Sequence, residues 1–336
     1  MAPSYPFKEL FLSEVSKIGG GMVNCHAHLD RAGTLTKDIW QQASALMEKK
    51  WFLMRDIKTA YSNDPETFKN RIREYIEYFK EQGITACRTH VDADSIVEMK
   101  VVNMMAEIRE EYKDNFILQL VAHPLEGFLN EDATDFDKHK TDLFEQACDI
   151  CDVVGGLPSR DRKMTNGDKK HADFLFNVAK NLGKDIDAHI DQENNPDEKD
   201  SEWFLDKIEE HGMQGRVTIV HAISVACQPT DYRNMIYKKF ADTDTNCSVC
   251  PKAAISMKQL KDKVAPLHNC LAQVDEMLDA GINVSIGTDN ISDIFVPEDN
   301  GDLYEEISFL ASACRLYDIE KLAKIAGING KKTLKI

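Results

Sequence analysis

The sequence lacks several features that would place the protein in specialised classes. Its 336 residues contain no apolar run of about 18 residues, which excludes a conventional membrane-spanning helix. The first residues have neither the basic start nor the long apolar stretch of a signal peptide, so we expect none. Basic residues are outnumbered, with 41 Lys and Arg against 57 Asp and Glu, and the formal net charge is −16. Because this charge repels phosphate backbones and anionic lipids, we expect neither nucleic acid nor membrane as a partner.

Linkers and a disulfide framework are missing as well. No Pro- or Ser-rich stretch divides the chain. The nine cysteines are an odd number without a secretion signal, which indicates reduced thiols in a cytoplasmic protein. Two Cys-x-x-Cys pairs, beginning at Cys148 and Cys247, are interpreted as buried thiols rather than as a structural zinc site. With 43% hydrophobic residues, the chain can bury a large core.

Short apolar runs rich in β-branched residues alternate with longer segments of helical periodicity. The predicted strands are Met22–His28, Ile84–Val91, Phe116–His123, Asp152–Leu157, Ile186–Asp191, Val217–Ala222, Asn246–Cys250 and Ile282–Asp289. The predicted helices are Asp64–Gln82, Val97–Tyr112, Phe136–Ala147, Ala172–Asn181, Lys199–His211, Asp231–Phe240, Leu271–Leu278, Leu303–Ala313 and Ile319–Ile325. Gly83, Gly183 and Gly281 fall where a helix should end before the next strand.

This alternation predicts the fold class. Eight successive β-then-α units favour a parallel sheet closed into a (β/α)₈ TIM barrel. An open doubly wound sheet is the alternative, but no Gly-x-Gly-x-x-Gly motif opens a helix. We therefore expect an N-terminal lead-in segment over residues 1–21 and a single barrel over residues 22–336.

Histidines gather at the C-terminal ends of the predicted strands, where the active sites of such barrels are built. His26 and His28 have the period-2 spacing that places two side chains on one face of a strand. His189 and His221 lie near the ends of the fifth and sixth strands, and Asp289 ends the eighth. Neutral imidazoles with one carboxylate suit Zn²⁺ or Fe²⁺, so a divalent metal site is predicted there. Histidines on helices or connections are expected at the surface; they are His139, His171, His211 and His268.

Motifs at seven strand ends carry a family resemblance. They are Cys25–Asp30, Arg88–Asp92, Leu118–Gly127, Val153–Pro158, Ala188–Gln192, Arg216–His221 and Gly281–Asn290. Together they resemble the amidohydrolase superfamily, within it the cytosine deaminase-like branch, over most of the chain. The resemblance implies that one metal ion is bound by His26, His28, His189 and Asp289, with His221 close to it. No lysine on the fourth strand matches the carboxylated lysine of two-metal members, so one ion is expected.

The ligand set predicts hydrolysis of a C–N bond. A divalent ion lowers the pKa of its water from about 15.7 to about 7 in favourable sites. Asp289 can take the proton while hydroxide attacks an sp² carbon bearing nitrogen, and His221 can stabilise the charge that develops on oxygen. The tetrahedral centre then expels an amine or opens a ring, and either outcome needs a protonated leaving nitrogen. We expect a small nitrogen-rich cyclic substrate and a deaminase-like reaction.

The chain departs from the deaminase pattern at the proton-shuttling glutamate, where it has Gln192. A glutamine can hydrogen-bond a ring edge, but it cannot act as an acid or base near pH 7. Asp191 or Glu193 takes that role, or Asp289 handles both proton transfers. Asp191 is the better placed substitute if the strand continues, because it then shares the face of His189.

Other positions predict how the substrate is held. Leu125 replaces a family glutamine that reads a pyrimidine edge, and Asn290 replaces a second aspartate, so cytosine itself is not the expected substrate. Phe295 occupies the region of an aromatic lid residue and can stack on a flat ring. Glu126 either contacts substrate or anchors its loop. His90 and Asp92, at the end of the second predicted strand, share one face; they either line the pocket or support it from behind, or they form a buried hydrogen-bonded pair.

Alternatives remain open at this point. Ring opening or amide cleavage is the rival reaction, since Asp289 can serve there as sole acid and base. A catalytically degenerate barrel that binds a metal or ligand without turnover is the rival from another class. The family's accessory β-sandwich has no room beside the barrel and is expected to be absent. Self-association is common in such barrels, but no feature of the sequence predicts a stoichiometry.

Overall fold

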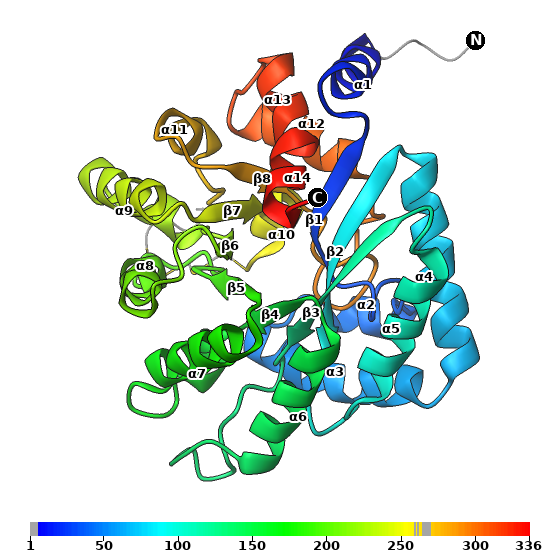
Figure 1. Ribbon diagram of the computed structural model, residues 1–336, viewed down its shortest axis with the longest axis vertical. Helices are drawn as coiled ribbons and strands as arrows, with labels where there is room; N and C mark the ends of the chain where they lie inside the picture. The colour runs from blue at the N-terminus through cyan, green and yellow to red at the C-terminus, as the bar shows by residue number, and fades with distance from the viewer. Residues whose placement is uncertain (1–5, 259, 261, 264–269) are drawn as a thin grey trace.

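The computed structural model describes residues 6–258, 260, 262–263 and 270–336, and these form an eight-stranded parallel barrel with helices around it (Figure 1). The strands are β1 Met22–Ala27, β2 Ile84–Asp92, β3 Ile117–His123, β4 Val153–Gly156, β5 Asp185–Ile190, β6 Val217–His221, β7 Asn246–Val249 and β8 Val284–Ile286. They are hydrogen-bonded in the order in which they occur along the chain. In the described part of the chain they make up the one sheet, so no accessory sandwich is found there.

The barrel closes between the ends of β1 and β8. Ala27 forms a parallel bridge with Asp289, whose backbone N–H donates to the carbonyl of His26 at 2.9 Å. Gly287 makes this approach possible, because a Cβ at this position would lie 2.5 Å from the same carbonyl oxygen. Closure excludes the open doubly wound sheet, and it brings Asp289 beside the His26–His28 pair.

Fourteen α-helices and two short 3₁₀ helices are described. The helices are α1 Pro6–Gly19, α2 Lys37–Gln42, α3 Met47–Ser62, α4 Pro65–Glu81, α5 Lys100–Tyr112, α6 Lys138–Ile150, α7 Gly167–Leu182, α8 Asp200–His211, α9 Thr230–Asp242, α10 Pro251–Ser256, α11 Val274–Asp279, α12 Leu303–Ala313, α13 Ile319–Ala326 and α14 Ile328–Leu334, with 3₁₀ turns at Pro158–Asp161 and Ser224–Cys227. Among the described residues, no helix combines the length and apolarity needed to cross a membrane.

Every predicted strand and helix overlaps one in the structure, but apolar periodicity failed to predict several further helices and placed one buried histidine at the surface. Residues 6–19 of the lead-in segment form α1, which packs against α13, and the 16-residue α3 was not predicted. His171 is buried rather than at the surface, and its Nδ1 lies 2.6 Å from Asp161. His268 lies outside the described residues.

The C-terminal helix α14 lies over the centre of the barrel in Figure 1 and closes its N-terminal end. Leu334 packs with three apolar side chains of β1 and β2, which are Val23, Cys25 and Ala86. Arg88 crosses the same end and donates to the carbonyl of Thr333 at 2.9 Å. The opposite, C-terminal end of the strands is therefore the one available for a ligand.

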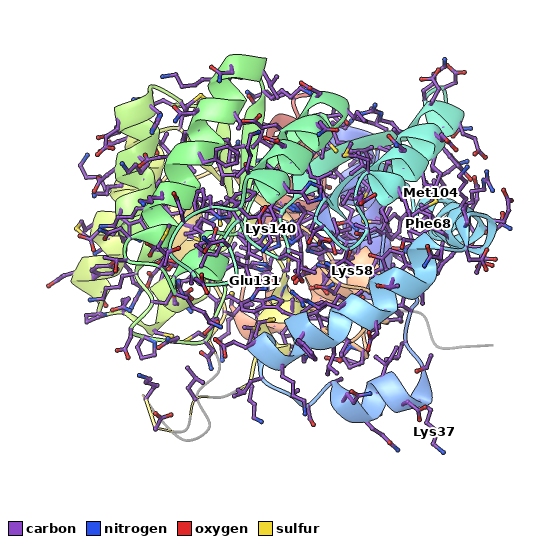
Figure 2. The ribbon with its side chains drawn as sticks, turned by 90° about the horizontal axis from the view of Figure 1, so that it is seen from below. Lys37, Lys58, Phe68, Met104, Glu131 and Lys140 are labelled. Carbon is purple, nitrogen blue, oxygen red and sulfur yellow. The ribbon has the colours of Figure 1, made fainter. Side chains whose placement is uncertain are left out.

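The unpredicted α3 is anchored by charges as well as by apolar contacts. Lys58 is fully buried and points inward from this helix, whereas Lys37 of α2 is exposed at the edge of the molecule (Figure 2). The ammonium of Lys58 pairs with Asp94, and it lies 3.8 Å from Asp92 and 3.6 Å from Glu126. A buried ammonium needs such compensation, so α3 is tied to the loops that follow β2 and β3.

Candidate metal centre and substrate pocket

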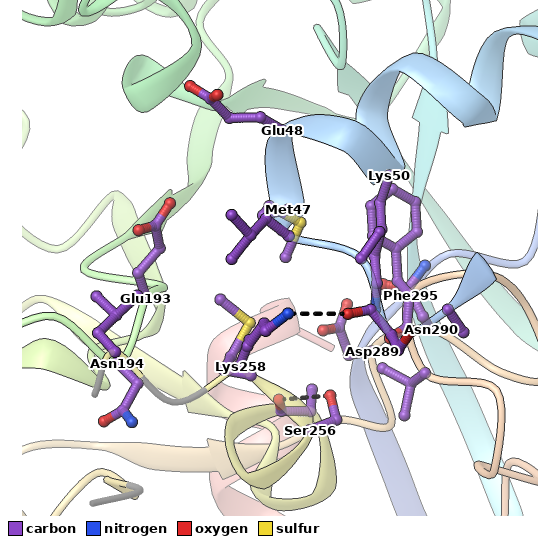
Figure 3. Close-up of a pocket in the computed structure, with 18 residues that line it drawn as sticks. Met47, Glu48, Lys50, Glu193, Asn194, Ser256, Lys258, Asp289, Asn290 and Phe295 are labelled. Atoms are coloured by element: carbon purple, nitrogen blue, oxygen red, sulfur yellow. Dashed lines mark hydrogen bonds between the residues drawn. The ribbon is translucent and has the colours of Figure 1, made fainter. Parts of the chain in front are cut away.

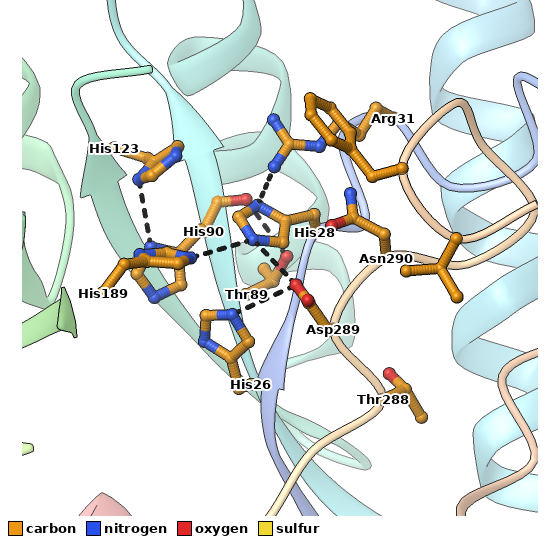
Figure 4. A network of polar contacts seen from close by, with 12 residues as sticks. His26, His28, Arg31, Thr89, His90, His123, His189, Thr288, Asp289 and Asn290 are labelled. Carbon is orange, nitrogen blue, oxygen red and sulfur yellow. Dashed lines mark hydrogen bonds and ion pairs between the residues drawn. The ribbon is translucent and has the colours of Figure 1, made fainter. Parts of the chain in front are cut away.

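Four predicted ligands converge at the C-terminal end of the barrel (Figure 4). Asp289 Oδ1 lies 3.3 Å from Nε2 of His26 and 3.3 Å from Nε2 of His28. His189 Nε2 lies 3.3 Å from Nε2 of His28. All four residues are buried, and one ligand atom from each lies within 4.8 Å of every other. β1, β5 and the chain after β8 therefore present one compact set of ligands.

The distances and the unmet hydrogen bonds both fit a metal ion. Ligands about 2.0–2.1 Å from one tetrahedral ion are about 3.3 Å from each other, which is the separation seen here. Both ring nitrogens of His26 are buried without a hydrogen-bond partner. Since a buried polar atom without a partner is costly, an ion that binds one of these nitrogens stabilises the arrangement.

The neighbouring histidines are held neutral, as metal ligands must be. Burial lowers the pKa of His28 and His189 well below the ordinary value. Burial also lowers the pKa of His221 to about 4, although the charge of Asp289 opposes this. Burial acts to raise the pKa of Asp289, but the His26 imidazole, whose Nε2 lies 3.3 Å from Oδ1, and the Arg31 guanidinium bring it below its usual value. The centre therefore offers neutral nitrogens and a carboxylate at pH 7.

Two residues at the strand ends adopt a left-handed backbone. Asp289 has a φ of 60° and His221 a φ of 82°, in a region that non-glycine residues rarely occupy. Both side chains line the cavity beside the ligands, and His221 Nδ1 is buried without a partner. Such strain is typical of functional positions, and here it accompanies side chains that face the centre.

Two cavities adjoin the ligands. The inner chamber, of about 40 Å³, is bordered by His28, His189, His221 and Asp289. An outer vestibule of about 570 Å³ opens beside it and is walled in part by Met47 and Glu193 (Figure 3). The two cavities share four residues, which are Met47, Asp289, Asn290 and Phe295. A ring held next to the ligands can therefore extend into the vestibule.

The expected position of Asp191 is wrong. β5 ends at Ile190, and Asp191 has a φ of 54°, so its side chain leaves the face of His189. Its carboxylate accepts the backbone N–H groups of Asp200 at 2.7 Å and Ser201 at 3.0 Å. Asp191 therefore holds the N-terminus of α8 instead of facing the chamber. The other candidate, Glu193, borders the vestibule only.

Glu126 and His90 are also displaced from their predicted substrate contacts. The carboxylate of Glu126 accepts from Arg55 Nε at 3.1 Å and borders neither cavity, which supports the loop-anchor interpretation. His90 lies behind the chamber, with its Nε2 3.0 Å from Asp187 and its Nδ1 3.4 Å from His123. His90 is thus buried and hydrogen-bonded behind the chamber, but its partners are Asp187 and His123 rather than Asp92.

The remaining predicted contact residues do border the chamber. Leu125 and Gln192 lie in its wall, and the side-chain amide of Gln192 donates to the hydroxyl of Ser159 at 3.1 Å. Asn290 and Phe295 border both cavities. Their roles toward a substrate stay predictions, but their positions allow those roles.

Sequence reasoning missed two polar residues around the centre. Arg31 borders the chamber, with Nη2 2.6 Å from His28 Nδ1 and Cζ 5.0 Å from the ring centroid of Phe295. His123 was not missed: its place at the end of the third predicted strand indicates a pocket-lining residue, and it borders the chamber. Asp187 lies below it, two residues before His189 on the same strand face, so the period-2 rule could have found it.

Comparisons with known proteins agree with this geometry. No protein-family model matches the chain. An uncharacterized protein of Haemophilus influenzae is 36% identical over 273 residues, covering 81% of this chain and 95% of that protein. N-isopropylammelide isopropyl amidohydrolase of Pseudomonas sp. strain ADP is 28% identical over 291 residues, covering 86% of this chain and 66% of the enzyme.

A solved structure shows the same fold. The 5-methylcytosine deaminase of Klebsiella pneumoniae superposes with a TM-score of 0.82 at 22% identity, covering 94% of this chain and 74% of that one. The chain therefore shares the barrel fold of that deaminase, and it is similar in sequence to an amidohydrolase over most of its length. Both findings agree with the resemblance of its strand-end motifs to the cytosine deaminase-like branch of the amidohydrolase superfamily.

Proposed function

We propose that the protein is a metal-dependent hydrolase that cleaves a C–N bond of a small nitrogen-containing ring, most readily by releasing an amine. The observation that carries the proposal is the convergence of His26, His28, His189 and Asp289, with one ligand atom of each within 4.8 Å of the others and three of the separations at 3.3 Å. Three imidazoles and one carboxylate favour Zn²⁺ or Fe²⁺, bound as a single ion. We further propose a cytoplasmic location, which the reduced thiols support.

Asp289 and His221 have separate roles in the proposed reaction. A bound divalent ion makes water a nucleophile near neutral pH. Asp289, ionised and beside the chamber, accepts the proton of the attacking water and can return it to the leaving nitrogen. His221 faces the same space and can donate a hydrogen bond to the oxygen on which charge develops.

The side chains that border the chamber favour a flat substrate. Trp51 and Phe295 border the chamber and offer aromatic faces, while Leu125 offers no hydrogen bond. The Pseudomonas relative is named for hydrolysis of an N-substituted aminotriazine, and the Klebsiella structure is of a deaminase of 5-methylcytosine. Both names support an amino-substituted heterocycle as the substrate class.

Ring opening is a second candidate, and one observation favours it. Among the described residues that border the chamber, Asp289 is the sole carboxylate. Gln192 cannot shuttle protons, and Asp191 is committed to α8. A reaction that needs one acid–base group therefore suits this chamber, and amide hydrolysis within a ring is such a reaction.

Metal analysis and product analysis together test the proposal. The purified protein should hold about one equivalent of divalent metal. It should release ammonia or an amine from aminated heterocycles, whereas a ring-opened product without ammonia would indicate the second candidate. Turnover that persists after the metal is removed would contradict both reactions. Bound metal with no product from any compound would favour the binding-only barrel.

The Asp289→Asn variant tests the role of the carboxylate. Loss of the acid–base group should lower kcat by about a thousandfold. Asp279→Asn is the matched control, because Asp279 is exposed on α11 and borders neither the chamber nor the vestibule. Equal activity of Asp289→Asn and the control would remove Asp289 from the chemistry.

A further inference from the structure

Two cysteines that lie far apart in the sequence meet behind the wall of the vestibule. Cys227 ends the 3₁₀ turn that follows β6, and Cys270 lies in the segment before α11. Both are free thiols, and Cys227 donates to Cys270 with 3.2 Å between the two sulfur atoms. The sulfur atoms need to approach each other by only about 1.2 Å to reach the length of a disulfide bond.

The other cysteines are poor candidates for oxidation. They include both Cys-x-x-Cys pairs, the motif by which sequence alone indicates a redox pair. Because the thiolate is the reactive form, a raised pKa makes a cysteine inert near neutral pH. Burial raises the pKa of seven thiols, which are Cys25, Cys87, Cys148, Cys151, Cys247, Cys250 and Cys314.

The pair of Cys227 and Cys270 differs from these thiols in three ways. The two sulfur atoms are already in contact. The hydrogen bond from Cys227 lowers the pKa of Cys270, although burial opposes this. Cys227 is half-buried, so a small solute can reach the pair. Proximity, a lowered pKa and access are together the properties of a redox-sensing pair.

Asn194 connects the two cysteines to the vestibule. Its Oδ1 accepts from the backbone N–H of Cys270 at 3.0 Å, and the thiol of Cys227 also donates to it, at 3.8 Å. Asn194 is buried and stands in the vestibule wall beside Glu193 (Figure 3). Since a disulfide has no S–H group, its formation removes one donor from Asn194 and draws the residue that carries the other toward Cys227.

We propose that Cys227 and Cys270 form a peroxide-sensitive thiol pair, whose oxidation to a disulfide alters the vestibule through Asn194. One sulfur attacks an oxygen of hydrogen peroxide, the O–O bond breaks, and a sulfenic acid and one water result. The second sulfur then forms the S–S bond and displaces the sulfenic oxygen as a second water. The two sulfurs together lose two electrons to the peroxide, and both thiol protons leave in the waters.

Peptide mapping tests the bond without any measurement of turnover. The zinc-loaded protein is treated with one equivalent of hydrogen peroxide, alkylated, and digested with trypsin in the absence of reductant. Cleavage after Lys and Arg places Cys227 in the peptide 217–233 and Cys270 in the peptide 264–315. We expect these two peptides to be linked, and the count of nine free thiols to fall by two.

Cys314→Ser is the matched control, because Cys314 is also half-buried and lies in the same peptide as Cys270. This variant should keep the link, whereas Cys227→Ser and Cys270→Ser should both lose it. A link that persists in Cys270→Ser, or loss of thiols spread evenly over the cysteines, would overturn the proposal. A second equivalent of zinc that wild type binds and both pair variants lack would assign the thiols to a metal site instead.

Kinetics tests the effect on the vestibule, and this part rests on the proposed function. The probe is an aminotriazine or aminopyrimidine that the reduced, zinc-loaded protein hydrolyses. Oxidation should raise KM at least about threefold and leave kcat within about twofold, because the ligands are untouched. Dithiothreitol should reverse the change, and Cys227→Ser should not respond to peroxide.

The possible failures can be told apart. An unchanged KM in protein whose disulfide has formed would overturn the link to the vestibule. A fall in kcat that accompanies loss of zinc would place the oxidation at the ligands and would overturn it as well. If the reduced, zinc-loaded protein hydrolyses no ring, the proposed function is rejected, while the linked peptides still decide whether the thiol pair exists.

Discussion

The buried histidines at the strand ends are the residues on which the chemistry and the acid stability of this protein both depend. Burial lowers the pKa of five of them, which are His28, His90, His123, His189 and His221. A neutral imidazole inside the barrel can bind a metal ion or accept a hydrogen bond. At low pH the same imidazoles destabilise the folded state, because histidines in the unfolded chain bind protons more readily.

This difference predicts how the stability of the metal-free protein changes with pH. In the folded state the pKa of His90 and of His221 is about 4, against about 6.5 for an unfolded chain. Between these values the unfolded state holds more protons, so the free energy of unfolding should fall as pH drops from about 6.5 to about 4. Each group contributes up to about 1.4 kcal/mol per pH unit.

Urea unfolding of the metal-free protein at pH 7, 6 and 5 measures this effect. His221→Asn should reduce the slope, because it removes one of the titrating groups. Stability that is constant or rises between pH 7 and pH 5 would show that these histidines are not held neutral in the folded protein.

Single site residues could be predicted from the sequence where their spacing along a strand, or their position at its end, determined where their side chains lie. The spacing of His26 and His28 and the strand-end positions of His189 and Asp289 were sufficient to group the ligands. Arg31 was not predictable, since nothing local indicates that its guanidinium folds back to within 2.6 Å of His28. Asp191 was mispredicted because the alternation rule assumes an extended backbone, and this residue has a positive φ.

At the scale of elements, the turn between β5 and α8 gives the carboxylate of Asp191 a structural role instead of a catalytic one. Asp191 accepts two backbone N–H groups at the start of α8, where the helix otherwise leaves its donors unpaired. Asp191→Ala should therefore lower the free energy of unfolding by about 1–2 kcal/mol. Metal content and kcat should stay near those of wild type.

Denaturant unfolding and metal analysis of the same preparation check this prediction. Asp137→Ala is a suitable comparison, because Asp137 also accepts two backbone N–H groups at the start of a helix, as the N-cap of α6, and borders neither cavity. If Asp191→Ala loses turnover while its stability matches wild type, Asp191 is the missing acid–base group after all.

Elements were predicted well where apolar periodicity was simple. Each of the eight strands was found within a few residues, because parallel barrel strands are short apolar runs bounded by turns. The helix α3 escaped because its buried face mixes Trp51 and Met54 with the buried Lys58. Periodicity counts a lysine as exposed, and only the carboxylates from other loops explain its burial.

At the scale of the whole molecule, the barrel is closed at one end by α14 and open to ligands at the other. The helix sits so close to β1 that a Cβ on Gly330 would lie 2.7 Å from Val23 and 2.9 Å from Cys25. Gly330→Ala should lower the free energy of unfolding by about 1–3 kcal/mol through overpacking. Gly19→Ala is the matched control, because its nearest neighbour would be 3.5 Å away.

Thermal or urea unfolding of both variants measures the contribution of this contact. The control should stay within about 0.5 kcal/mol of wild type. Two variants of equal stability would mean that α14 does not press against the barrel as described. The barrel fold could be predicted from the eight successive β-then-α units. The packing of α14 against β1 could not, because it depends on a contact between the two ends of the sequence.

The central claim is that one divalent ion is bound by three histidines and one aspartate at the strand ends. Anomalous scattering from a crystal of the zinc-loaded protein, measured on both sides of the zinc absorption edge, tests it most directly. The account predicts one strong peak in contact with His26, His28, His189 and Asp289. A peak confined to the acidic group of Asp191, Glu198 and Asp200, or to His90 and His123, would contradict it.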